Sequence, residues 1–367
     1  MMLNTRSTVF AICIAIASAG QAEWSMFRGS PARTGVTEER LPERLALAWV
    51  HEMNGSVNCS AAIVNRAIFV GNDDGLFVAL SLDQGKRTWE FQAQGGIESS
   101  PAVKDGRIFF GDDQGFFYAL DQRTGEQIWR FEVQGKIIAS PTVEDKRVYL
   151  ASYDHFLYCL DRVTGDLIWK HETDAQIHCS PCLTSDSVLT GGCDGFLRWV
   201  AKKNGELDMK VDVQDVVAAT PVFHQGSVYA AVLGGRVLRV EADKGLLIWD
   251  VSVGKNSPEL MASPAVKDDR IVLAGRDRVA RCLNAKTGEE IWAFETQGSI
   301  DSSPLVAGED VFFGSSDGNL YRVSLAEGKQ LWRFPTASPI TASPAVAEGR
   351  LVVGVEDGAV YCFKGKD

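Results

Sequence analysis

The sequence of 367 residues lacks a long hydrophobic run and a block of basic residues. Its apolar stretch near the start, Val9 to Ala19, has 11 residues, which is too short to span a bilayer. The formal net charge is -11, and no cluster of lysine and arginine alternates with aromatic residues. The short apolar stretch means that we expect no transmembrane segment. Because binding to nucleic acid depends on such basic clusters, we also expect no nucleic-acid partner.

The first residues have the features of a secretory signal peptide. Arg6 precedes the apolar stretch, and the small residues around Ala19 and Ala22 supply cleavage sites. We expect cleavage after Ala22 and a periplasmic or secreted monomer; the alternative is a buried N-terminal helix. Cys13 lacks the residue pattern that precedes a lipidated cysteine, so no lipid anchor is expected.

What the sequence has instead is an internal repeat with a step of about 40 residues. Seven of its eight units carry a tryptophan at one position, and Met209 replaces it in the remaining unit. The seven are Trp49, Trp89, Trp129, Trp169, Trp249, Trp292 and Trp332. A second series keeps the same step: Ser60, Ser100, Ser140, Ser180, Thr220, Ser263, Ser303 and Ser343. Such a period, with four short apolar runs per unit, is typical of a β-propeller.

One unit shows the expected blade. We expect strands at 97–104, 107–111, 116–120 and 127–133, joined by tight turns. Asp105-Gly106 and the Asp-Gly pairs of other units favour the positive φ angles that two-residue hairpins need. Because these aspartates repeat from unit to unit, they indicate structure and not catalysis.

The two ends of the chain indicate how the ring closes. The last unit stops before its tryptophan strand, whereas a strand at 45–50 with Trp49 precedes the first serine strand. We predict an all-β, eight-bladed propeller of four-stranded antiparallel blades, closed by the N-terminal strand, which completes the last blade. The expected division is a signal peptide at 1–22, an extension across one propeller face at 23–44 and the propeller at 45–367.

The cysteines do not form an obvious disulfide framework. Cleavage after Ala22 would leave seven, an odd number that argues against complete pairing. His178, Cys179, Cys182 and Cys193 lie close together in the sequence, but the spacing of Cys179 and Cys182 on a strand directs them to opposite faces. We therefore expect no metal site, while a disulfide between Cys179 and Cys193 stays open.

The segment 119–129, Ala-Leu-Asp-Gln-Arg-Thr-Gly-Glu-Gln-Ile-Trp, resembles the tryptophan docking motif of propellers related to the pyrroloquinoline-quinone (PQQ) dehydrogenases. The segments 159–169 and 282–292 are similar to it. Two branches share such repeats: the quinoprotein dehydrogenases, and non-enzymatic propellers resembling the outer-membrane assembly factor BamB. The uniform repeats, without large insertions, are similar to the second branch.

The dehydrogenase branch implies a quinone held against a disulfide of adjacent cysteines, and a calcium ion beside a catalytic aspartate. This sequence has no adjacent cysteines and no insertion that gathers the roughly six to eight oxygens that calcium prefers. We therefore expect no catalytic residue and no cofactor. PQQ and calcium belong to the alternative of a small quinoprotein dehydrogenase.

A binding site is expected where the repeat is least uniform. The position before each pair of a small residue and a serine or threonine varies most, and propeller geometry places it at one channel mouth together with two hairpins that depart from Asp-Gly. The candidate residues for this face are Asn58, Glu98, Tyr153, His155, His178, Arg276, Arg278, Asp301 and Thr341. The insertion at 255–259 falls on the same face. The alternative is ordinary variation at a solvated mouth.

The uniform repeat favours a non-enzymatic, protein-binding scaffold with a protein partner in the cell envelope, including outer-membrane protein assembly. Two alternatives remain: a small quinoprotein dehydrogenase, and a propeller that binds a glycan or another small ligand.

Overall fold

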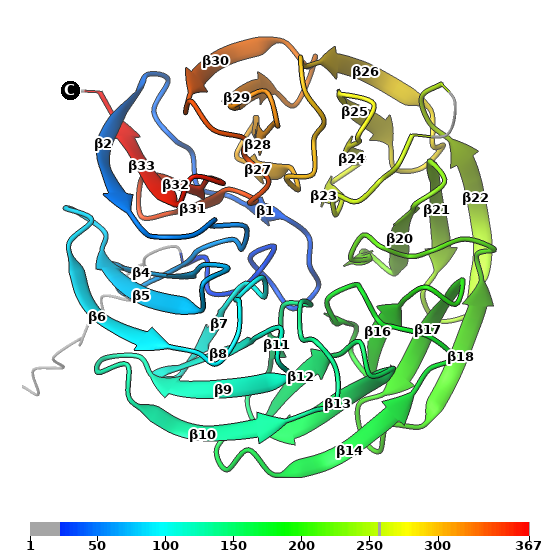
Figure 1. The fold of residues 1–367 in the computed structure, drawn as a ribbon. Coiled ribbons are helices and arrows are strands. Elements are labelled where there is room, and N and C mark those ends of the chain that lie inside the picture. Colours follow the sequence, from blue (N-terminus) through cyan, green and yellow to red (C-terminus); the bar gives the residue numbers. More distant parts are fainter. Residues whose placement is uncertain (1–22, 256–257, 367) are drawn as a thin grey trace, which may run out of the picture.

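The computed structural model describes residues 23–255 and 258–366 (Figure 1). All regular elements in these ranges are β-strands, and they form eight sheets around a central axis. The prediction of an all-β, eight-bladed propeller is confirmed. The predicted signal peptide lies outside the described residues.

Each blade runs from an inner strand beside the axis to an outer strand at the rim. Blade 1 contains β3 (Ala62–Val64), β4 (Ala67–Gly71), β5 (Leu76–Ser81) and β6 (Arg87–Gln92). Blade 2 contains β7 (Ala102–Lys104), β8 (Arg107–Gly111), β9 (Phe116–Asp121) and β10 (Gln127–Glu132). Blade 3 contains β11 (Thr142–Val143), β12 (Arg147–Ala151), β13 (Phe156–Asp161) and β14 (Leu167–Glu172). Blade 4 contains β15 (Cys182–Leu183), β16 (Ser187–Gly191), β17 (Phe196–Ala201) and β18 (Leu207–Asp212).

The second half of the ring repeats this order. Blade 5 contains β19 (Val222–His224), β20 (Ser227–Val232), β21 (Arg236–Glu241) and β22 (Leu246–Ser252). Blade 6 contains β23 (Ala265–Lys267), β24 (Arg270–Ala274), β25 (Val279–Asn284) and β26 (Glu290–Glu295). Blade 7 contains β27 (Leu305–Ala307), β28 (Asp310–Gly314), β29 (Asn319–Ser324) and β30 (Gln330–Pro335). Blade 8 contains β31 (Ala345–Ala347), β32 (Arg350–Gly354), β33 (Ala359–Gly365) and the N-terminal strand β2 (Leu45–Glu52).

The inner strands are shorter than the sequence suggested. In blade 2 the strand begins at Ala102 and not at position 97. The physical reason is that a side chain replaces the backbone ladder there: the Gly111 N–H donates to the Ser99 hydroxyl at 3.3 Å, and Pro101 has no N–H to offer. The Asp105-Gly106 turn has the expected positive φ angles of 47° and 75°.

The ring is closed by the pairing of the two ends of the propeller. β2 pairs antiparallel with β33, and Trp49 lies opposite Cys362. The predicted completion of the last blade by the N-terminal strand is therefore confirmed. Figure 1 shows β2, in blue, along the outside of the red C-terminal strands.

The tryptophans hold neighbouring blades together. The Trp292 indole N–H donates to the Leu325 carbonyl of the next blade at 2.9 Å, and its ring covers Gly328. A Cβ at Gly328 would lie 2.6 Å from the indole, so only glycine permits this approach. Met209 covers Gly245 of the next blade in the same way, because its sulfur lies where a Cβ at Gly245 would be. Its side chain has no N–H to donate to the next blade.

The segment before β2 follows the inside of the ring. It includes β1 (Val36–Thr37), which pairs in parallel with β27 and lies beside the axis in Figure 1. Six inner strands donate a backbone N–H to a carbonyl of this segment: Ile63 to Trp24, Val103 to Ser25, Leu183 to Pro31, Phe223 to Ala32, Val266 to Thr34 and Val306 to Gly35. The segment therefore satisfies edge N–H groups that would otherwise face the channel.

Candidate functional site

A ring of hydroxyls surrounds the axis above the N-terminal segment. In seven places the backbone N–H of one ring residue donates to the hydroxyl of the equivalent residue in the next blade, as from Ser60 to Ser100 at 2.9 Å and from Ser180 to Thr220 at 3.0 Å. The other five bonds follow the same rule around the ring. The repeated serines thus link blade to blade, which explains their regular spacing.

The ring hydroxyls and the variable positions of the repeat line one well of about 310 Å³. The sequence-predicted residues Asn58, Glu98, His178, Asp301 and Thr341 all line it. Ile138, Ala218 and Met261 occupy the same position in the other blades, and Phe27 of the N-terminal segment also contributes to the lining. Residues from all eight blades therefore converge on one well.

Side chains at the rim of the well form two local pairs and one cluster of three residues. The Tyr153 hydroxyl lies 2.6 Å from Nδ1 of His178. The Thr341 hydroxyl donates to the Asn58 side-chain carbonyl at 2.9 Å. Two of the predicted residues, Tyr153 and His178, are thus brought into contact although they come from different blades.

Arg276 forms the third rim contact and is the most highly connected charge there. Its guanidinium bonds Asp301 and Glu259, each at 2.8 Å. Both bonds raise the pKa of Arg276, with the bond to Asp301 the larger cause. Glu98 forms no ion pair with any described residue, so the rim carries one free carboxylate beside one paired cluster.

Four predicted residues do not line the well: Tyr153 and Arg276, which contact the lining residues His178 and Asp301, and also His155 and Arg278. His155 and Arg278 have φ angles of 76° and 69°, the left-handed conformation that glycine adopts in the other blades. Arg278 lines a separate cavity of about 280 Å³ with Asp277 and Glu295. Of the insertion at 255–259, positions 256 and 257 lie outside the described residues, and Glu259 contacts Arg276.

Two arginines near the floor of the well were not singled out from the sequence. Arg28 and Arg33 are 1% and 0% exposed, and their guanidinium carbons lie 6.0 and 5.7 Å from the centre of the Phe27 ring. Because arginine is mostly exposed in proteins, nothing in the sequence marked these two as buried. The only available signal was their place between small and aromatic residues just after the expected cleavage site.

Burial lowers the pKa of four histidines, His51, His171, His178 and His224, below the usual 6.5. The unfolded chain then binds protons at a higher pH than the folded protein does. The free energy of unfolding should therefore fall as the pH drops below about 6.5, and change little from this cause above it. Urea unfolding at pH 7.5, 6.5 and 5.5 measures this; a stability that rises on acidification would contradict the assignment.

The described cysteines have structural positions. All seven are free of disulfides, so Cys179 and Cys193 are not joined. The Gly191 N–H donates to the Cys179 sulfur at 3.0 Å, the equivalent of the bond that the Gly111 N–H donates to the Ser99 hydroxyl. Burial raises the pKa of Cys179 to about 11 and of Cys182 to about 12, so both are neutral thiols at pH 7. Within the described ranges, no group of three or more His, Cys, Asp or Glu side chains is placed to hold a metal ion.

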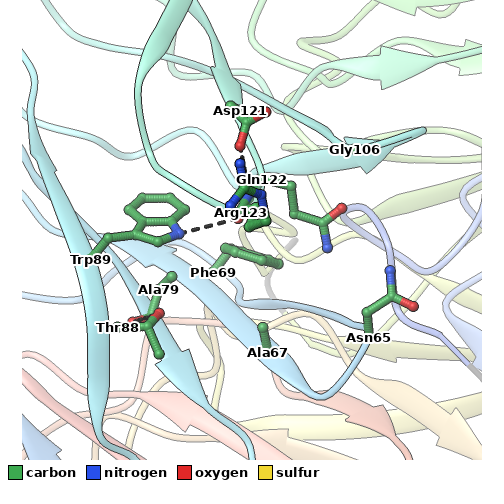
Figure 2. A pocket seen from close by; sticks show the side chains of 10 residues that line it. All are labelled: Asn65, Ala67, Phe69, Ala79, Thr88, Trp89, Gly106, Asp121, Gln122 and Arg123. Carbon is green, nitrogen blue, oxygen red and sulfur yellow. Dashed lines mark hydrogen bonds between the residues drawn. The ribbon is translucent and has the colours of Figure 1, made fainter.

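A second cavity, of about 470 Å³, lies between blades 1 and 2 on the opposite face (Figure 2). It is lined by the exposed edge of Trp89, by Phe69 and by the turn that carries Asp121 and Arg123. The dashed line from Trp89 in Figure 2 is its bond to the Gln122 carbonyl, at 3.1 Å. These are the docking residues of the repeat, so this cavity results from blade packing.

No helix in the described chain has the length and apolarity needed to cross a membrane.

A family model described as "Beta-alanine-activating enzyme, beta-propeller" matches residues 142–367, more than half of the chain. The chain belongs to this beta-propeller family. A second model, described as "Outer membrane protein assembly factor BamB", matches residues 17–134. This member of the family is thus a PQQ-like β-propeller that resembles BamB, as the docking motif indicated. No curated protein shows significant similarity to it in sequence.

Solved structures share the fold of this propeller at low sequence identity. BamB from Moraxella catarrhalis is 18% identical with a TM-score of 0.77, covering 88% of this chain and 100% of its own. Quinohemoprotein alcohol dehydrogenase from Comamonas testosteroni is 14% identical with a TM-score of 0.82, covering 94% and 81%. The computationally designed protein Ika8 is 18% identical with a TM-score of 0.77, covering 86% and 98%. Because a designed protein matches as well as BamB, these likenesses establish architecture alone.

Proposed function

We propose that the protein is a non-enzymatic scaffold of the cell envelope that binds a protein partner at the face carrying the well. The observation that carries this proposal is the convergence of the variable positions on one rim, while the rest of the ring follows the repeat. Residues that the fold does not require are gathered where another molecule can reach them.

The chemistry of the rim supports binding and not nucleophilic catalysis. An activated serine needs a base within hydrogen-bonding distance. In the described chain, each ring hydroxyl that forms a hydrogen bond accepts it from a backbone N–H, and none contacts a histidine or a carboxylate. His178 contacts the Tyr153 hydroxyl, whose pKa burial raises to about 12.

Arg276 is the residue on which we expect a partner to depend most. Its side chain is 47% exposed while two carboxylates hold its guanidinium in place. Arginine held in this way is common among residues that dominate protein interfaces, because little side-chain freedom is lost on binding. The envelope location follows from the same proposal together with the expected signal peptide.

Capture of partners from an envelope extract tests the proposal. Arg276→Glu should place three carboxylates together and abolish capture, whereas Arg123→Glu, the same charge reversal in an exposed turn of the opposite face, should leave capture unchanged. Equal capture by both variants and the unmodified protein would show that the partner binds elsewhere.

A further inference from the structure

The ring hydroxyls retain unused hydrogen-bond donors. A serine hydroxyl can accept hydrogen bonds and donate one. Seven ring hydroxyls accept a backbone N–H, and no described residue accepts a hydrogen bond from any of the eight. The ring residues are at most 8% exposed, and their hydroxyls line the well. A circle of buried O–H donors without protein acceptors therefore faces one small space.

Two buried positive charges lie directly beneath this circle. Arg33 donates to the carbonyl of the ring residue Ser140 at 2.9 Å, and Arg28 donates at 2.9 Å to the carbonyl of Pro264, which follows Ser263. The two arginines thus lie on different sides of the axis, under blades 3 and 6. Burial lowers the pKa of Arg28 to about 9 and of Arg33 to about 10, so both remain charged at pH 7.

No described carboxylate neutralises these charges. Neither arginine takes part in an ion pair in the described chain; their partners are carbonyls and one hydroxyl, and Nε of Arg28 has no hydrogen-bond partner. A buried cation without a counterion is costly, and an anion nearby offsets that cost. Of the two carboxylates that line the well, Asp301 is paired with Arg276, and Glu98, which forms no ion pair, is exposed at the rim.

We propose that the well binds a small oxyanion, with the ring hydroxyls as donors and Arg28 and Arg33 as the charges that select its sign. Hydrogen bonds from hydroxyls to a charged oxygen are among the stronger ones in proteins. Phe27 lines the well and lies near both guanidiniums, whereas neither arginine lines it, so the arginines act through their field and not by direct contact. This proposal does not depend on a protein partner, since a free phosphate and a carboxylate carried by a partner offer the same chemistry.

Two neighbouring serines provide a matched test. Ser303 belongs to the ring, whereas Ser302 is fully buried and turned away from the well, where its hydroxyl bonds the Ala342 carbonyl at 2.8 Å and the Gly314 N–H at 3.0 Å. Ser302→Ala removes more hydrogen bonds than Ser303→Ala, so a purely structural effect should be larger in Ser302→Ala. Anion binding should instead weaken about tenfold in Ser303→Ala and stay unchanged in Ser302→Ala.

Calorimetric titration with inorganic phosphate, and separately with N-acetylated triglutamate, measures the binding. We expect saturable binding of at least one probe to the full-length protein, and the tighter one identifies a free anion or a chain-borne carboxylate as the source. Glu98→Gln should tighten binding, because it removes the free negative charge at the rim. The proposal is overturned by the absence of binding at tens of millimolar of both probes, by equal weakening in both serine variants, or by weaker binding to Glu98→Gln.

Discussion

A chain that begins at Met53 is expected to lose cooperative folding. It lacks β2, so the whole length of β33 becomes an open sheet edge, and Gly85 loses the Trp49 ring that covers it. It also lacks the segment whose carbonyls accept N–H groups from six inner strands. A propeller in which the edge of β33 is unpaired at the rim is prone to pair with other chains, so we expect aggregation and no single unfolding transition.

Two further truncations separate the causes. A chain that begins at Glu23 keeps every described contact of the ring and should unfold like the full-length protein. A chain that begins at Arg44 keeps β2 but loses the inner segment, and should fold with reduced stability. Urea unfolding followed by tryptophan fluorescence and by light scattering compares the three. An unchanged, cooperative transition in the chain from Met53 would contradict closure by the N-terminal strand.

Trp292→Ala is expected to lower the free energy of unfolding by about 3 to 5 kcal/mol. The indole is 7% exposed, packs over Gly328 and donates to the Leu325 carbonyl at 2.9 Å. Its removal leaves a cavity between blades 6 and 7 and a carbonyl without its donor. Both effects act in the same direction, because a cavity and an unsatisfied buried group each destabilise the folded state.

Two substitutions calibrate this effect. Ile291→Ala changes the adjacent residue, which is 42% exposed, and should alter stability by less than about 0.5 kcal/mol. Met209→Ala changes the one docking position without an indole and should cost about 2 kcal/mol, less than Trp292→Ala. Equilibrium urea unfolding gives all three values. A loss below about 1 kcal/mol for Trp292→Ala would mean that docking does not hold the blades together.

The fold was predictable because the residues that stabilise each blade recur in the sequence. Six of the seven docking tryptophans lie over a glycine of the next blade, the hairpins need residues that tolerate positive φ, and these requirements recur at a nearly fixed step. Closure was equally visible, since Trp49 has no serine strand before it. The inner strand of blade 2 was overestimated because a serine hydroxyl, and not a backbone group, accepts the glycine N–H at the end of the ladder, as also happens in blade 7.

The well was only partly predictable. Asn58, Glu98, His178, Asp301 and Thr341 share one repeat position, and the symmetry of the ring brings one position from every blade to one place. The floor could not be found in this way. The segment with Arg28 and Arg33 has no repeat, and its contacts with the blades run through backbone carbonyls, which leave no pattern in the side chains. His155 and Arg278 were placed by their hairpins, but the positive φ at each position leaves the residue outside the well.

The dissociation constant of a captured partner, measured for the unmodified protein, Arg276→Glu and Arg123→Glu, tests most directly the claim that function resides on the face with the well. The account predicts a loss of at least about tenfold for Arg276→Glu, equivalent to about 1.4 kcal/mol, and no change for Arg123→Glu. An affinity unaffected by Arg276→Glu, or reduced equally by both variants, would contradict it.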